Sequence, residues 1–188
     1  MEIYIIIFYS RGGNKMLKKV SNQYAFTLVE LLAVIVILSI LMAIAVPNII
    51  STLDRNKKVT YIGDAKKLIA LARNQLGNKI NKPGYGELVR VNLSCLDAQD
   101  LPSDPEGNPY DEEESFVVIV RKNEELIYYV NLIGKSSNGK TRGIYLTERS
   151  TLDGDRRMSL VKKNITAPTD DAIRSTTGVS GTIRTCGS

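Results

Sequence analysis

One continuous apolar segment dominates the pattern of hydrophobic and polar positions along the chain. It runs from Phe26 to Val46, with the sequence FTLVELLAVIVILSILMAIAV, and its only charged residue is Glu30. About 21 residues at a helical rise of about 1.5 Å each reach across the hydrocarbon core of a bilayer, which is about 30 Å thick. The pattern therefore predicts a membrane-spanning helix over residues 26–46.

A cleavable secretory signal peptide is the competing interpretation, because it also places lysines before an apolar stretch. The segment here is longer than the apolar region of such a peptide and carries a carboxylate near its beginning. It is followed by Pro47-Asn48-Ile49-Ile50, where a signal peptide has small residues at its cleavage site. We therefore expect the helix to be retained.

Beyond Pro47 the helical pattern becomes amphipathic. Apolar residues at a 3,4,3,4 spacing form one stripe, which consists of Ile62, Ala65, Ile69, Ala72 and Leu76. Gly77-Asn78 is typical of a helix C-terminus. Together, residues 26–46 and 47–78 predict one helix of about 50 residues, which Pro47 should kink or loosen midway.

The remaining residues, 79–188, predict a β-rich globular domain. Segments rich in β-branched and aromatic residues are expected as strands at 88–91, 115–120, 126–133 and 144–146. Residues 121–125 and the pair Asn138-Gly139 are expected as hairpin turns. The predicted fold class is α+β, with the second half of the helix packed on an antiparallel sheet of about four strands.

The C-terminal residues 153–188 are polar with scattered apolar positions, which predicts a loosely ordered tail. The two cysteines of the chain are Cys95 and Cys186. A disulfide between them would pin the tail to the domain across a loop of about 90 residues and stabilise the fold by roughly 4 kcal/mol. Two free, buried thiols are the alternative.

Composition narrows the functional classes. The chain has no histidine, no serine or cysteine beside a suitable base and no glycine-rich phosphate loop, so an enzyme is the least supported class. We expect no catalytic, cofactor-binding or metal-ligating residue.

Of the net charge of +5, residues 1–25 account for four basic and one acidic side chain, which leaves +2 for the rest. Nucleic acid is therefore not indicated as a partner, and the leading charges orient the helix with its start in the cytoplasm.

The stretch from Ala25 to Asn48 resembles the class III signal of type IV prepilins and pseudopilins. The resemblance implies cleavage between Ala25 and Phe26 by a membrane prepilin peptidase, followed by methylation of the new Phe26 amine. Family members usually have glycine where Ala25 stands. The fold of the family is similar to the predicted one, a long N-terminal helix whose second half packs on an antiparallel sheet.

Glu30 is the leading candidate for a functional residue, because a carboxylate inside a bilayer costs at least a few kcal/mol unless it is paired. The resemblance implies that Glu30 of an incoming subunit neutralises the Phe26 amine of its neighbour and so sets the axial register of a filament. Pro47 would permit local melting of the helix during assembly. The alternative is that Glu30 only interacts with the helix dipole and the lipid headgroups, which is still compatible with membrane insertion.

Residues 104–110, with the sequence DPEGNPY, look like the DPxGNPY turn of major pseudopilins, which commonly have tryptophan where Glu106 stands. Two prolines and a glycine predict a rigid turn in which Asp104 or Asn108 caps local amides. The acidic residues from Asp104 to Glu114 could instead hold calcium, although the spacing is not that of an EF-hand loop.

The first residues suggest a misassigned start. Met16-Leu17-Lys18-Lys19 already looks like the complete beginning of a short basic leader, and residues 11–15 could be encoded by a purine-rich ribosome-binding site. The leader would then occupy residues 16–25 of the stretch 1–25. The alternative is a genuine apolar extension at residues 3–9, which is too short to span a membrane.

The sequence is interpreted as a structural subunit of a type IV pilus, either major or minor, held as a single-pass membrane protein before assembly and extracellular afterwards. Its expected partners are the prepilin peptidase, other pilin subunits and a pilus assembly platform. The composition, rich in Ile, Asn and Lys, looks like that of a Gram-positive bacterium. The alternatives are a pseudopilin of a secretion or DNA-uptake machine and a single-pass surface protein that never polymerises.

Overall fold

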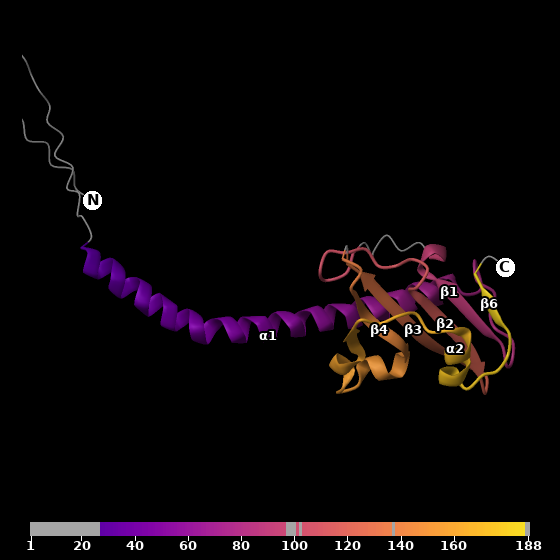
Figure 1. Cartoon of the computed structure of the whole chain (residues 1–188). Helices are drawn as coiled ribbons and strands as arrows, with labels where there is room; N and C mark the ends of the chain where they lie inside the picture. Colours follow the sequence, from indigo (N-terminus) through magenta and orange to yellow (C-terminus); the bar gives the residue numbers. More distant parts are fainter. Residues whose placement is uncertain (1–26, 97–100, 102, 137, 187–188) are drawn as a thin grey trace, which may run out of the picture. The chain divides into compact units, whose positions relative to one another are not determined.

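The computed structural model describes residues 27–96, 101, 103–136 and 138–186 (Figure 1). The chain divides into two compact units, residues 1–47 and residues 48–188. The predicted leader, including Ala25 and Phe26, lies outside the described residues.

A single helix, α1, runs from Leu28 to Gln75 and continues through Pro47. The backbone leaves the helical conformation at Gly77, whose φ of 93° favours glycine, so the predicted end of the helix is confirmed. The predicted apolar stripe is confirmed at four positions, because Ile62, Ala65, Ile69 and Ala72 are buried, whereas Leu76 lies just beyond the helix and is half-buried. Tyr61 and Leu68 widen this buried stripe.

The sheet of residues 48–188 has six strands in the order β5-β4-β3-β2-β1-β6. The four predicted strands are β1 (Leu88–Asn92), β2 (Phe116–Lys122), β3 (Glu125–Lys135) and β4 (Thr141–Glu148), and they pair antiparallel in sequence order. The α+β class is confirmed. The strand count and the purely antiparallel order are wrong, because β5 (Val161–Lys163) and β6 (Ile183–Thr185) extend the sheet and β6 pairs parallel to β1.

The prediction of a loosely ordered tail is wrong as well. After two 3-10 turns, Arg149–Asp153 and Arg157–Leu160, the chain forms β5, the helix α2 (Asp170–Thr177) and β6. The hydroxyl of Thr169 accepts a hydrogen bond from the backbone N–H of Ala172 at 3.3 Å, which caps the start of α2. Gly178 ends α2 with a φ of 66°.

The sheet is buried on both faces, which explains why a polar segment becomes ordered. In β2, Val117 and Ile119 point to the face covered by α1, whereas Phe116, Val118 and Val120 point to the opposite face. That second face is covered by Ile173 of α2 and by Val179, and Ile183 of β6 packs against the same cluster. The uninterrupted apolar run of β2 is typical of a strand with two buried faces and was the sequence signal for this second layer.

Two buried tyrosine–carboxylate hydrogen bonds join α1 to the 104–110 turn. The hydroxyl of Tyr61 donates to Asp104 Oδ2 at 2.8 Å, and the hydroxyl of Tyr110 donates to Asp64 Oδ2 at 2.8 Å. Burial raises the pKa of both tyrosines, so their hydroxyls remain protonated donors. Each element therefore supplies one tyrosine and one aspartate, which fixes α1 and the turn in one register.

We predict that Gly134→Ala breaks the Tyr61–Asp104 contact. A Cβ at Gly134 would lie 2.9 Å from the Tyr61 hydroxyl and still closer to Asp104 Oδ2, so one of the two side chains has to move. The free energy of unfolding should fall by about 2 kcal/mol, as expected when a buried polar pair is disrupted. Thermal unfolding of the detergent-solubilised chain measures this. The control, Gly154→Ala, meets its nearest atom only at 3.4 Å and should change stability little.

Candidate assembly surface and its support

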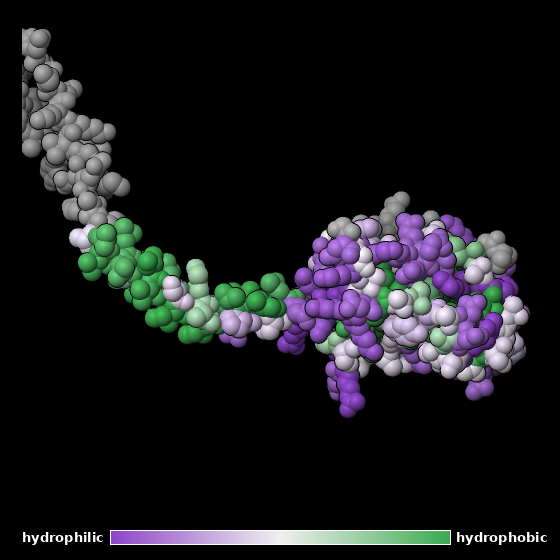
Figure 2. All heavy atoms as spheres, viewed as in Figure 1, coloured by the Kyte–Doolittle hydropathy of each residue, from purple (hydrophilic) through white to green (hydrophobic). Residues whose placement is uncertain are grey.

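The first half of α1 exposes an apolar surface over its full circumference. Every residue from Leu28 to Val46 is exposed, and the exposed fraction of the large apolar side chains in this stretch ranges from 45% at Leu38 to 80% at Leu28. On the side that Figure 2 shows, this stretch is predominantly hydrophobic. The helix is long and apolar enough to cross a membrane. Water is an unfavourable environment for such a surface, so lipid or other apolar helices have to cover it.

The few polar groups of this stretch are satisfied within the helix. The hydroxyl of Ser39 donates to the carbonyl oxygen of Ile35 at 2.7 Å. Pro47 has no N–H and cannot donate to the carbonyl of Ala43, so the hydrogen-bond ladder is weakest where the apolar segment ends. The structure keeps this position helical, and the loosening expected during assembly remains a prediction.

Glu30 belongs to a capping box at the start of α1. Its Oε2 accepts hydrogen bonds from the backbone N–H of Thr27 at 2.8 Å and from the Thr27 hydroxyl at 2.9 Å. In return, the N–H of Glu30 donates to the Thr27 hydroxyl at 3.3 Å. The spacing Thr-x-x-Glu is the sequence signal of this motif, and the sequence analysis missed the role of Thr27. Glu30 therefore has a structural function within its own subunit.

The 104–110 turn supports the helix from the side of the globular domain. Asp104 Oδ1 accepts hydrogen bonds from the backbone N–H groups of Glu106 at 2.9 Å and Asn108 at 2.8 Å, which confirms the expected capping role. Gly107 adopts a φ of 86° between them. Within the described residues, no group of three or more acidic, histidine or cysteine side chains is placed to hold a metal ion.

Arg142 links this turn to α1 by two ion pairs. Its guanidinium donates to Asp54 Oδ1 at 2.6 Å and to Glu106 Oε1 at 2.9 Å, and Lys57 adds a contact to Glu106 at 3.3 Å. Hydrogen bonding from Arg142, and then from Lys58, lowers the pKa of Asp54 from 3.8 to about 2. No local sequence signal identified this network, because its members come from three separate segments that only the fold brings together.

A second ionic network contacts α1 at Lys66, closer to the C-terminal end of the helix. Asp153 is paired with both Lys66 and Arg149, and the pairing with Lys66, followed by that with Arg149, lowers the pKa of Asp153 to about 2. Ionic contacts therefore flank the tyrosine–aspartate pairs along the helix.

The two cysteines of the chain form a disulfide that links its C-terminal end to the residues after β1. Cys95 and Cys186 are joined by a disulfide with a Cα–Cα distance of 6.3 Å. The N–H of Cys186 donates to the carbonyl oxygen of Arg90 at 3.0 Å, which continues the pairing of β6 with β1. The disulfide therefore anchors the C-terminal end of β6 to the globular domain.

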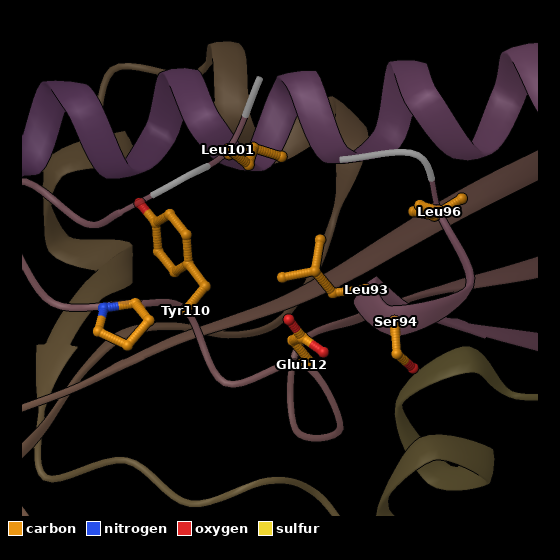
Figure 3. A pocket seen from close by; sticks show the side chains of 7 residues that line it. Leu93, Ser94, Leu96, Leu101, Tyr110 and Glu112 are labelled. Carbon is orange, nitrogen blue, oxygen red and sulfur yellow. The ribbon is translucent and has the colours of Figure 1, made fainter. Parts of the chain in front are cut away.

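A pocket of about 270 Å³ lies beside the turn (Figure 3). Its walls are formed by Leu93, Ser94, Leu96, Leu101, Pro109, Tyr110 and Glu112. The Tyr110 hydroxyl is already bonded to Asp64. Its lining includes one carboxylate, that of Glu112, and no acid–base pair for catalysis.

Comparisons with known proteins agree with this arrangement. A family model described as the prokaryotic N-terminal methylation motif matches residues 20–46. The chain is similar to the type II secretion system core protein G of Pseudomonas aeruginosa, with 34% identity over 102 residues that cover 47% of this chain and 72% of that protein. No solved structure matches the chain significantly.

We predict that Arg142→Met lowers the free energy of unfolding by about 1–2 kcal/mol at neutral pH. Asp54 and Glu106 would lose their buried partner, but their side chains are 41% and 31% exposed and can hydrate, so the loss is smaller than for a fully buried pair.

The same variant should change the pH dependence of stability. A pKa of about 2 in the folded state, against 3.8 as the ordinary value, means that the pairing of Asp54 stabilises the fold above about pH 4 and is lost as the pH falls towards 2. Arg142→Met should flatten this acid transition in thermal unfolding between pH 2 and 5. The control Glu124→Gln weakens the exposed pair of Glu124 with Arg121 and should cost only a few tenths of a kcal/mol. If the stability of Arg142→Met depended on pH between 2 and 5 as that of the wild type does, the pairing with Arg142 would not be the cause of the lowered pKa of Asp54.

Proposed function

Because the chain belongs to the family of type IV pilins and pseudopilins, which are structural subunits and not enzymes, we propose that it is a subunit of a type IV pilus. Members of this family are anchored in a membrane before assembly and associate with other pilin-like subunits and a membrane machinery. The proposed filament forms when the first half of α1 exchanges lipid for the same segment of neighbouring copies.

The observation that carries this proposal is the exposed apolar half of α1 on a chain whose second half is firmly packed. Residues Leu28 to Val46 are exposed throughout, whereas the apolar stripe between Tyr61 and Ala72 is buried against the globular domain. A soluble, solitary protein would not keep such a surface in water. A filament core of packed helices covers it.

Processing at the N-terminus is part of the proposal. The matched motif ends at Val46 and begins six residues before Phe26, so it includes the expected cleavage site between Ala25 and Phe26. The prepilin peptidase would expose the Phe26 amine, which is then methylated and paired with Glu30 of a neighbour. The mature subunit would leave the membrane for an extracellular filament.

A pseudopilin of a secretion machine is the second candidate, and a specific finding favours it. The similarity to the secretion core protein G covers 72% of that protein, and the turn at 104–110 is like that of major pseudopilins. Both candidates use the same assembly mechanism. They differ in whether the filament extends from the cell surface, which immunoelectron microscopy of intact cells shows directly.

We predict that Glu30→Gln abolishes filament assembly but not membrane insertion. Glutamine can still close the capping box with Thr27, so the helix start is preserved while the charge is lost. Removing one partner of a desolvated charge pair costs about 2 kcal/mol or more, so the amount of subunit in the sheared surface fraction should fall at least about tenfold. Quantitative immunoblots of the sheared and membrane fractions measure this.

The matched control is Thr27→Ala, which removes the cap and keeps the charge. It should assemble nearly normally. If Glu30→Gln forms normal filaments while Thr27→Ala does not, Glu30 acts only as a cap and the proposed pairing with the Phe26 amine is incorrect.

A further inference from the structure

The second half of α1 has a face that its own chain leaves uncovered. This outer face lies opposite the buried stripe and is formed by the exposed residues Arg55, Val59, Thr60, Lys67, Ala70 and Arg73. Arg55 and Arg73 are 18 residues apart, which is five helical turns, so both side chains lie on the same line along the helix.

All charged side chains that are exposed on this face are basic. The acidic residues of this half of α1 are Asp54 and Asp64, and both are directed to partners on the globular domain, Arg142 and Tyr110. Lys67 contacts Asp64 at 3.4 Å but its side chain remains 59% exposed. The outer face therefore presents a positive surface that runs along the helix.

Gly63 interrupts this face at a position where the subunit has no need of glycine. A Cβ added there would meet no atom within 4 Å, and the backbone is helical. Glycine in a helix interior lowers helix stability, because it increases the conformational freedom of the unfolded chain. Packing within the subunit does not explain why glycine is present despite this loss of helix stability. A close approach by the backbone of another molecule would explain it.

The acidic residues 111–114 of a second copy fit this surface. They are four consecutive carboxylates, of which Glu112 and Glu113 are exposed, and Glu113 also accepts a hydrogen bond from Asn92 at 3.1 Å. Within one subunit they cannot cover the outer face, because the Tyr110–Asp64 bond holds the preceding residue at the buried side of α1. The outer face belongs to α1, the helix whose first half is the proposed assembly segment.

We propose that the outer face of α1 receives the acidic segment 111–114 of a neighbouring copy of this chain, and that Gly63 allows the two backbones to come close. The proposal rests on the proposed filament function and adds a second contact to it. Opposite charges across the interface fix the register of neighbouring globular domains and oppose misaligned pairs.

Gly63→Leu tests the close approach. Leucine is a good helix former and its Cβ would meet no atom of the subunit within 4 Å, so the thermal midpoint of the detergent-solubilised full chain should stay the same or rise. The amount of subunit in the sheared surface fraction should nevertheless fall at least about tenfold. Ser175→Leu places the same side chain on the exposed surface of α2 and should assemble like the wild type.

A charge exchange tests the occupant. The double variant Arg55→Glu/Arg73→Glu should assemble poorly, and adding Glu112→Lys, which leaves the Asn92–Glu113 bond intact, should restore filaments at least in part. The control Lys162→Glu/Lys163→Glu introduces the same change of charge on β5 and should have no such effect.

The outcomes separate the two proposals. If wild-type filaments form and Gly63→Leu assembles normally, or the charge exchange fails to restore assembly, the docking of segment 111–114 on α1 is overturned and the filament function stands. If the wild-type chain itself never enters a sheared filament, the filament function is overturned and the docking proposal with it.

Discussion

The exposed apolar half of α1 is the constraint on which the rest of the molecule depends. A helix with apolar side chains on every side from Leu28 to Val46 cannot remain in water, so its surroundings have to come from outside the subunit. Lipid and neighbouring helices are chemically similar environments, which permits transfer from one to the other at a small cost in free energy. The membrane thus stores subunits in a form that is ready for assembly.

The second half of α1 has the opposite requirement, because it has to stay attached to the globular domain while the first half changes its environment. The attachment combines a buried apolar stripe with the two tyrosine–aspartate bonds and the ion pairs of Arg142 and Asp153. Hydrogen-bonded buried groups lose much energy when they are displaced, so these contacts resist slippage of the helix along the sheet. Pro47, where the helical ladder lacks a donor, separates the two halves.

The elements predicted well from sequence were those with a local signal. The 48-residue helix, its end near Gly77 and the strands β1 to β4 follow from hydrophobic periodicity and turn residues. β5, β6 and α2 were missed because each is short and contributes only a few apolar side chains, and their order depends on the second face of the sheet. That face was indicated by the run Phe116 to Val120, which was interpreted only as a strand.

The candidate site likewise combines residues that have a local sequence signal with residues that only the tertiary structure brings together. Glu30 was found because a carboxylate in an apolar segment is conspicuous, but its cap with Thr27 was overlooked. Arg142 and Asp54 are 88 residues apart and carry no motif, so no inspection of the sequence could pair them. The two networks on α1 are products of the tertiary structure.

The state of the N-terminus in the native host tests the central claim most directly. The sheared surface fraction and the membrane fraction would be separated, and the first residue of the protein determined in each by mass spectrometry. The account predicts a chain that begins with N-methylated Phe26 in the surface fraction. A chain that still begins at Met1 or Met16 and is confined to the membrane would contradict it, because no Phe26 amine would then exist for Glu30 to neutralise.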